Sequence, residues 1–259
     1  EVAPSQFEMN YSYSEALIAA DQIQLYKLVC RQVAQRMDLT ASFLPKPVAG
    51  VNGNGLWFDG TNDSTSVPAT RYGGIANSFT FSLWVNPSAP RTSTTQSTSG
   101  TPGTSAQRYA IFPTHGDNSY GSGHAGAGIS VGPNGVSVFE HASGYMPSVL
   151  VTNLPVSGWT HVAVVYNNKL PRLYVNGTWI KDGVAGTKTV HPGCALGGTS
   201  YGWYQGNLDD VRIYNYALPS WDVAALASGD WDGDWMPDTW EVSHFGDTHA
   251  VNGGAGEEG

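Results

Sequence analysis

The sequence predicts an all-β fold in which two antiparallel sheets pack face to face, with helical material appended. The stretch 158–177, GWTHVAVVYNNKLPRLYVNG, is the main basis for this prediction. Within 159–166 apolar residues occupy both alternating positions, which is typical of a strand covered on both faces. Asn167-Asn168-Lys169 then turns the chain, and Asn176-Gly177 favours a second tight turn. A hairpin followed at once by a third strand, 178–181, indicates the middle of a sandwich.

The composition is that of a turn-rich, aromatic-rich β protein. The 259 residues include 32 Gly, 13 Tyr and 9 Trp, and only 13% are charged. Residues 1–55 hold five acids and four bases, 56–227 hold eight of each, and 228–259 hold eight acids and no base. No basic face exists to neutralise phosphates, which argues against nucleic acid as a partner. No apolar run approaches the roughly 20 residues that a membrane span needs.

From residue 56 onward the apolar pattern changes to period two. The segment 79–85 alternates apolar and polar residues, as a half-buried strand does. The segment 87–107, rich in Ser, Thr, Pro and Gly, is predicted to be a long surface loop. A short helix over 217–228, capped at Ser220, is expected to close the domain. The other strand candidates are 56–58, 64–67, 109–112, 128–131, 136–141, 149–152, 195–198 and 206–214.

Six motifs in order carry a family resemblance. They read FDGTND, FTFSLWVNP, GWTHVAVVY, RLYVNG, GGTSY and GNLDDVRIYNYAL, and together they cover about 56–219. In this order and spacing the segment resembles laminin-G-like domains of the concanavalin A-like jelly-roll type. The resemblance implies two curved antiparallel sheets over a domain at 56–227, with Trp84, Trp159 and Tyr174 between or beside them.

The same resemblance implies a possible structural calcium ion, because such domains often hold one near the first turn and the last strand. Oxygen ligands on loops suit this hard cation. Equally, the first three of these residues can be turn formers and the last two can end a strand. The positions that could serve are Asp59, Asn62, Asp63, Asp209 and Asp210.

Residues 1–55 read differently, with a helix predicted over 14–36. The stretches EVAPSQFE, AADQIQLYKLVCRQVAQRM and TASFLPKPVAGVNGNG resemble a contiguous internal piece of the glutamine synthetase catalytic domain. By that resemblance Glu1 and Glu8 match paired carboxylates that hold a divalent metal, and Asn52-Gly53 matches a glutamate-contacting loop. The family continues with Met-His where this chain has Leu56-Trp57, so the match implies ancestry of a segment rather than an activity. Without the rest of that domain, the two glutamates are expected to be solvated acids rather than metal ligands.

Exposed aromatic side chains in or near loops are the candidate ligand contacts, because aromatic rings can stack on sugar faces. Packing at the solvent edge would explain them equally well. His161 lies inside an apolar strand and is predicted to be a hydrogen-bonded structural histidine. Glycosidases usually need a pair of carboxylates, and no such sequence pair accompanies Glu140, the sole glutamate of 56–227; this disfavours a hydrolase. The candidate aromatics are Tyr120, Tyr145, Tyr201, Trp203 and Tyr204.

The acidic tail, 228–259, contains a calcium-loop pattern. Its oxygens fall at loop positions 1, 3, 5, 9 and 12, with a backbone carbonyl at 7, which is the EF-hand-type spacing. The segment also resembles thrombospondin type 3 calcium repeats. One departure is Trp235 at position 6, where a glycine is usual. The predicted calcium ligands are Asp230, Asp232, Asp234, Met236, Asp238 and Glu241.

Together these features predict a non-catalytic binding module of a secreted or surface bacterial protein. Its expected partner is carbohydrate or another extracellular polymer or protein, and calcium is the expected cofactor. Two alternatives stay open: a glutamine synthetase-type ATP-dependent ligase, resting on 1–55 alone, and a structural spacer in a surface assembly. The chain has no initiator Met and no signal peptide, so it resembles a fragment, and the missing targeting signals say little about its location.

Overall fold

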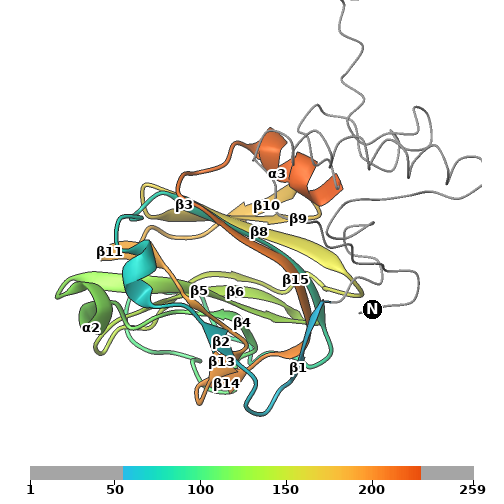
Figure 1. Cartoon of the computed structure of the whole chain (residues 1–259), viewed down its shortest axis with the longest axis horizontal. Coiled ribbons are helices and arrows are strands. Elements are labelled where there is room, and N and C mark those ends of the chain that lie inside the picture. Colours follow the sequence, from blue (N-terminus) through green and yellow to red (C-terminus); the bar gives the residue numbers. More distant parts are fainter. Residues whose placement is uncertain (1–54, 229–259) are drawn as a thin grey trace, which may run out of the picture. The chain divides into compact units, whose positions relative to one another are not determined.

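The computed structural model divides the chain into two compact units, Glu1–Pro47 and Val48–Gly259. It describes residues 55–228, which belong to the second unit. These residues form the predicted sandwich: two antiparallel sheets with the core between them (Figure 1). Within the described part, no helix combines the length and apolar character needed to cross a membrane.

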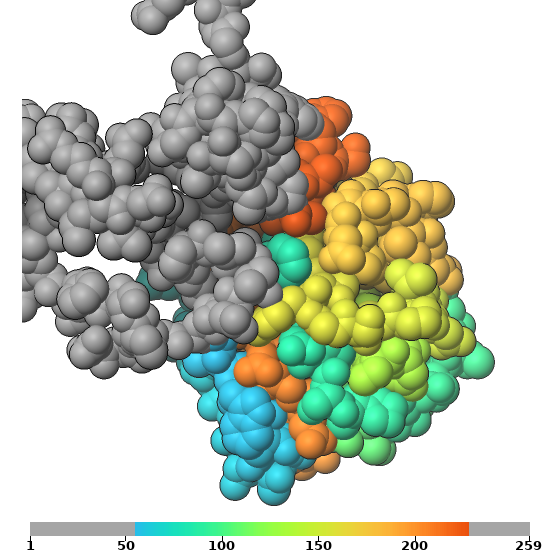
Figure 2. Space-filling model, turned by 90° about the vertical axis from the view of Figure 1, so that its right-hand side faces the viewer, coloured from blue at the N-terminus to red at the C-terminus, as the bar shows by residue number. Residues whose placement is uncertain are grey.

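One layer is a six-stranded sheet in the order β1-β15-β3-β8-β9-β10. Its first and last strands in the sequence are neighbours, and Figure 2 shows the start of the domain, in blue, against the orange of β15. All of its strand pairs are antiparallel. The strands are β1 (Leu56–Asp59), β3 (Phe79–Pro87), β8 (Thr160–Asn167), β9 (Leu170–Val175), β10 (Thr178–Asp182) and β15 (Gln205–Tyr214).

The second layer is a seven-stranded sheet in the order β2-β12-β4-β5-β6-β7, with β11 parallel to β5. A two-stranded ribbon, β13 (Gly198–Thr199) with β14 (Gly202–Trp203), lies against β4 (Figure 1). Three short helices complete the domain: η1 (Ala69–Tyr72), α2 (Gly116–Tyr120) and α3 (Ser220–Ser228). The strands of this layer are β2 (Thr65–Ser66), β4 (Tyr109–Phe112), β5 (His124–Gly132), β6 (Gly135–His141), β7 (Ser148–Thr152), β11 (Thr189–Pro192) and β12 (Ala195–Leu196).

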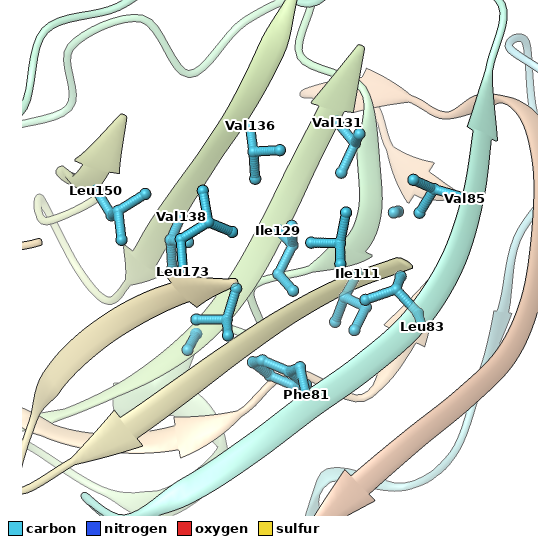
Figure 3. Packing of buried hydrophobic residues seen from close by; sticks show 14 of the residues in the cluster. Phe81, Leu83, Val85, Ile111, Ile129, Val131, Val136, Val138, Leu150 and Leu173 are labelled. Atoms are coloured by element: carbon cyan, nitrogen blue, oxygen red, sulfur yellow. The ribbon is translucent and has the colours of Figure 1, made fainter. Parts of the chain in front are cut away.

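The core lies between the two sheets. Alternate residues of β3 point into it and meet branched side chains from the opposite sheet (Figure 3). This alternation is the period-two pattern seen in the sequence, since successive side chains of a strand face opposite sides. The labelled core residues are Phe81, Leu83, Val85, Ile111, Ile129, Val131, Val136, Val138, Leu150 and Leu173.

The central hairpin is covered on both faces, as its sequence predicts. Val162 and Val164 belong to the main core, whereas Ala163 and Val165 pack with Val223 of α3 on the outer side of the sheet. Left-handed residues form the two turns here: Asn168-Lys169 joins β8 to β9, and Asn176-Gly177 joins β9 to β10. Such pairs of positive φ angles match the right-handed twist of the strands that they join. The six-stranded sheet therefore has a buried outer face where α3 covers it.

Four short elements were not predicted, namely η1, α2, β11 and β14, and β5 begins four residues before the predicted 128–131. The start of β5 reads HAGAG, whose small residues give no recognisable hydrophobic alternation. A Cβ atom on Gly126 would lie 2.2 Å from the Thr114 carbonyl oxygen, and one on Gly128 would lie 2.4 Å from Pro113 N. The glycines thus let the chain cross directly over the outer face of β5 between β4 and α2. This crossing brings His115 onto that face.

Candidate functional site

The five candidate aromatics occupy different environments. Tyr201 is the most accessible, with 42% of its surface exposed. Tyr120 and Trp203 are partly buried. Tyr145 and Tyr204 are buried, and the Tyr204 hydroxyl donates to the carbonyl of Asn207 at 3.1 Å. A buried ring has no free face for a sugar, so Tyr204 is a core residue.

Tyr201 lies at the tip of the β13–β14 ribbon, where its backbone N–H donates to Thr199 Oγ1 at 3.4 Å. The ribbon is held close to the sheet by Gly202, because a Cβ atom there would lie 2.1 Å from the Gln107 carbonyl oxygen. Arg108 Nη1 also donates to the carbonyl of Trp203 at 3.1 Å. These contacts fix the position of the exposed Tyr201 ring over the end of β4.

Beneath and beside Tyr201 lie three further rings, and we call Phe112, His115, His141 and Tyr201 the Tyr201 cluster. Phe112 stacks on Tyr201 with ring centroids 6.0 Å apart and an interplanar angle of 26°. The His141 ring lies 5.7 Å from Tyr201 and 4.7 Å from His115. The four residues come from β4, β6, the N-cap of α2 and the ribbon. An exposed aromatic face thus adjoins two imidazoles on the outer side of the seven-stranded sheet.

Both imidazoles are held by backbone groups. His141 Nδ1 donates to the carbonyl of Pro113 at 2.9 Å, and His115 Nδ1 accepts from the Asn118 backbone N–H at 3.3 Å. Burial lowers the pKa of His141, and the neighbouring His115 lowers it further, although the bond to Pro113 acts in the opposite direction. His141 is therefore neutral at physiological pH.

Tyr120 belongs to a second ring group with His124 and His191, on the other side of α2. Its ring stacks on His191 at 4.0 Å, and His124 Nδ1 lies 2.8 Å from His191 Nε2. The Tyr120 hydroxyl donates to the Ala69 carbonyl at 3.0 Å. Because its hydroxyl and one ring face are already engaged, Tyr120 mainly ties α2 to η1 and β11.

Glu140 is a buried carboxyl that sequence reasoning did not place. The hydroxyl of Tyr145 donates to Oε2 at 2.9 Å, and that of Tyr166, from the opposite sheet, donates to Oε1 at 3.3 Å. Burial raises the pKa of Glu140 to about 7, against the lowering effect of both hydroxyls and of Lys169. The Tyr145 hydroxyl also explains why that candidate aromatic faces inward.

His161 is the buried, hydrogen-bonded histidine that the sequence predicts. Its Nε2 lies 2.9 Å from Ser82 Oγ, and burial lowers its pKa to about 4. The Trp84 ring is 5.5 Å away on the outer side of the same sheet. Trp84 and Tyr174, which packs with α3, therefore flank the sandwich.

The aspartates near the first turn and the last strand make local contacts. Asp59 Oδ1 accepts from the Thr61 backbone N–H at 2.7 Å, and Asp63 Oδ2 accepts from the Asp59 N–H at 2.9 Å, as turn-forming residues do. Asp209 Oδ1 accepts from the N–H of Asp210, whose φ is 45°. Asn62 lies within the first turn. Nowhere in 55–228 do three or more His, Cys, Asp or Glu side chains gather in a metal-binding group.

The remaining predicted metal ligands lie outside the described residues. These are Glu1 and Glu8 at the start of the chain, and the tail loop ligands Asp230, Asp232, Asp234, Met236, Asp238 and Glu241.

Residues 59–224 match the family described as the concanavalin A-like lectin/glucanases superfamily, and the chain belongs to it. Residues 1–60 match the glutamine synthetase catalytic domain. Over 59 residues the chain is 48% identical to glutamine synthetases of Staphylococcus aureus and Staphylococcus epidermidis. This alignment covers 23% of the chain and 13% of those enzymes.

Solved structures similar to the chain include domain 4 of AbnA, a GH43 extracellular arabinanase from Geobacillus stearothermophilus, in complex with arabinotriose. It is 22% identical, with a TM-score of 0.40, and the alignment covers 68% of this chain and 82% of that one. A heptameric SAP-like pentraxin from Limulus polyphemus is 14% identical, with a TM-score of 0.45 and coverages of 66% and 80%. The binding domain of botulinum neurotoxin DC in complex with SialylT is 11% identical, with a TM-score of 0.47 and coverages of 73% and 45%.

Proposed function

We propose that the sandwich is a non-catalytic binding module of an extracellular or cell-surface bacterial protein, and that it recognises carbohydrate or another hydroxyl-rich polymer through the Tyr201 cluster. The observation that supports this function best is an exposed tyrosine ring that stacks on a buried phenylalanine and lies beside the His141 imidazole, which in turn contacts the His115 imidazole. Sugar rings offer a C–H face for stacking and hydroxyls for hydrogen bonding, and this surface supplies partners for both.

The fixed position of Tyr201 favours binding. A flexible side chain loses about 0.5–1.5 kcal/mol of freedom when a ligand immobilises it. The contact with Phe112 and the anchored ribbon restrain the Tyr201 ring before any ligand arrives. The charge balance of 56–227, eight acids against eight bases, gives no field that would select a strongly charged partner.

The placement of Glu140 argues against hydrolysis in the described part. A glycosidase places two carboxyl groups on either side of the scissile bond, so the substrate must reach both of them. Glu140 is fully buried between two tyrosine hydroxyls, and Gly186 packs over it so closely that a Cβ atom there would lie 2.3 Å from Oε2. Its surroundings fit a structural carboxylic acid.

Replacing Tyr201 by alanine tests this function. We expect Tyr201→Ala to weaken binding by about 1–3 kcal/mol, taking aromatic stacking on nucleic-acid bases as the nearest scale. That is a loss of about 5- to 150-fold. The measurement is affinity electrophoresis of the whole chain in gels that contain arabinan, galactan, xylan, mannan or β-1,3-glucan.

Tyr216→Ala is the matched control, because Tyr216 is 51% exposed and lies next to Tyr214, a residue of the six-stranded sheet. It should bind like the unmodified chain. Absence of retardation of the unmodified chain in every gel would refute the binding module and favour the spacer, and equal retardation of the unmodified chain and Tyr201→Ala would refute the Tyr201 cluster as the binding surface.

We propose further that the tail loop at 230–241 binds one calcium ion. Five acidic side chains within twelve residues repel one another, and a divalent cation relieves this repulsion. We expect an affinity of about 10⁻⁴–10⁻³ M, the range of extracellular modules. Calcium titration of the whole chain, followed by tryptophan fluorescence, should saturate, and the change should disappear in Asp232→Ala/Glu241→Ala. A titration that is flat to tens of millimolar would leave only an acidic tail.

A further inference from the structure

The two imidazoles of the Tyr201 cluster are locked in opposite tautomers. A carbonyl oxygen can only accept a hydrogen bond, so His141 must carry its proton on Nδ1 to donate to Pro113. A backbone N–H can only donate, so His115 must have a bare Nδ1 to accept from Asn118. In each neutral ring the remaining nitrogen is Nε2, and the two Nε2 atoms have opposite hydrogen-bonding roles. That of His141 accepts a hydrogen bond, whereas that of His115 carries a proton and donates one.

Both second nitrogens are available at the surface. Neither is bonded within 55–228, and neither is among the buried side-chain atoms of that part that lack a partner. His141 keeps 8% of its surface exposed, and His115 is partly exposed. Their ring centroids are 4.7 Å apart, and Tyr201 lies next to His141.

We propose that His115 and His141 act as a donor–acceptor pair that selects neutral, hydroxyl-bearing ligands and releases them on acidification. This inference rests on the proposed binding function. A hydroxyl both donates and accepts through one oxygen, so one hydroxyl or two adjacent hydroxyls satisfy both rings. A carboxylate only accepts and an ammonium only donates, so each leaves one imidazole unpaired. An unpaired buried polar group costs free energy, which makes the pair selective.

Acidification changes the chemistry of this pair. Protonation of His141 turns Nε2 from an acceptor into a donor, so a ligand hydroxyl would then meet two donors. The charged and titratable groups that face the pair are Tyr201 on the ribbon and Asp117 on α2. The Asp117 Oδ1 atom lies 3.7 Å from Lys188 Nζ. Asp117 already accepts from the N–H groups of Gly123 and Ser143.

The tautomers can be measured without any ligand. Among the seven imidazoles of the whole chain, long-range ¹H–¹⁵N correlation spectra recorded at pH 7.5 should show one signal of a ring protonated on Nδ1 that belongs to His141 and one signal of a ring protonated on Nε2 that belongs to His115. Loss of the first signal in His141→Gln and of the second in His115→Gln assigns them. The same tautomer in both rings, or a charged ring at that pH, would overturn the proposal whatever the chain binds.

The binding test uses the same polysaccharide gels at pH 7.5 and pH 4.5, with polyacrylate, which carries carboxylates and no hydroxyls, as the anionic counterpart. We expect retardation by a neutral polymer at pH 7.5, at least tenfold weaker binding at pH 4.5, and no retardation by polyacrylate. His141→Gln should bind more weakly than the unmodified chain at pH 7.5, but its affinity should be the same at both pH values because glutamine does not titrate. His124→Gln, on the other side of α2, is the matched control and should keep the full pH response.

The outcomes separate the two proposals. If no neutral polymer retards the unmodified chain, the binding function fails and the selectivity fails with it. If a neutral polymer binds but the pH response persists in His141→Gln, or polyacrylate binds as well, only the donor–acceptor proposal fails. Circular dichroism at both pH values verifies that each variant remains folded.

Discussion

Glu140→Gln should stabilise the domain by about 3 kcal/mol above pH 7, and this gain should vanish below about pH 4.5. The native fold raises the pKa of this carboxyl from 4.5 to about 7, chiefly because burial disfavours its charged form. A shift of about 2.5 pKa units corresponds to about 3 kcal/mol.

The sign follows from proton linkage. Between pH 4.5 and 7 the folded protein holds the Glu140 proton while the unfolded chain has released it, so stability falls as the pH rises. Below the unfolded pKa both states are protonated and no penalty exists. Glutamine resembles the protonated acid, because it offers one acceptor to a tyrosine hydroxyl and one N–H₂ group to the other.

Urea unfolding of both proteins at pH 4.5, 6 and 8 measures this effect. Stability of the unmodified domain should decline relative to Glu140→Gln across the series. Tyr145→Phe is the complementary variant: it removes the 2.9 Å bond to Oε2 and should destabilise more at pH 8 than at pH 4.5, since a bond to a carboxylate is stronger. Parallel pH profiles for the unmodified domain and Glu140→Gln would show that this carboxyl does not titrate as its burial implies.

Tyr204→Ala should destabilise the domain by about 3–5 kcal/mol, the usual cost of truncating a buried aromatic ring. The Tyr204 side chain is 0% exposed and contacts Phe58 edge-to-face, with ring centroids 5.9 Å apart. The change leaves a cavity between the sheets and removes the hydroxyl bond to Asn207. Chemical denaturation at pH 7 gives the difference in the free energy of unfolding.

Tyr201→Ala is the comparison, because the two tyrosines lie three residues apart on the same short segment. Tyr201 is largely solvent-exposed, so its loss should change the free energy of unfolding by less than about 1 kcal/mol. Similar losses of stability in both variants would mean that the ribbon is part of the core and that Tyr201 is not a free binding surface.

Much of the sandwich could be predicted from local patterns. The hairpin of β8 and β9 combines apolar residues on both faces with turn residues that accept positive φ, and it forms as predicted. Period-two alternation likewise located β3, β6 and β15 to within two residues. These elements could be read from the sequence because backbone geometry alone relates spacing to the face of a strand.

Elements without a strong apolar pattern could not be predicted. The β11 strand has the short sequence TVHP, and it forms because it pairs in parallel with the first half of β5. Another segment crosses closely over that half of β5, and the glycines of β5 leave the room for it. The pairing partners lie about 65 residues apart in the sequence, since His191 faces Gly126. Nothing near either residue signals the other.

The candidate site shows the same division. Composition alone identified aromatic residues in loops, but exposure separates Tyr201 from Tyr204. The ribbon geometry decides this exposure, and that geometry depends on the close approach of Gly202 to Gln107. His115 and His141 are 26 residues apart and carry no spacing signal, yet their rings lie side by side. Their tautomers follow from two backbone groups, Pro113 and Asn118, that only the folded chain brings into contact with them.

By itself, then, the sequence determined the sandwich, its central hairpin, its family and the calcium-loop pattern of the tail, because these depend on spacing within short segments. Only the tertiary structure decided which aromatic rings reach solvent, which histidines meet, and why Glu140 holds its proton. Exposure, ring contacts and desolvation are properties of residues distant in sequence that folding brings together, and no local pattern encodes them.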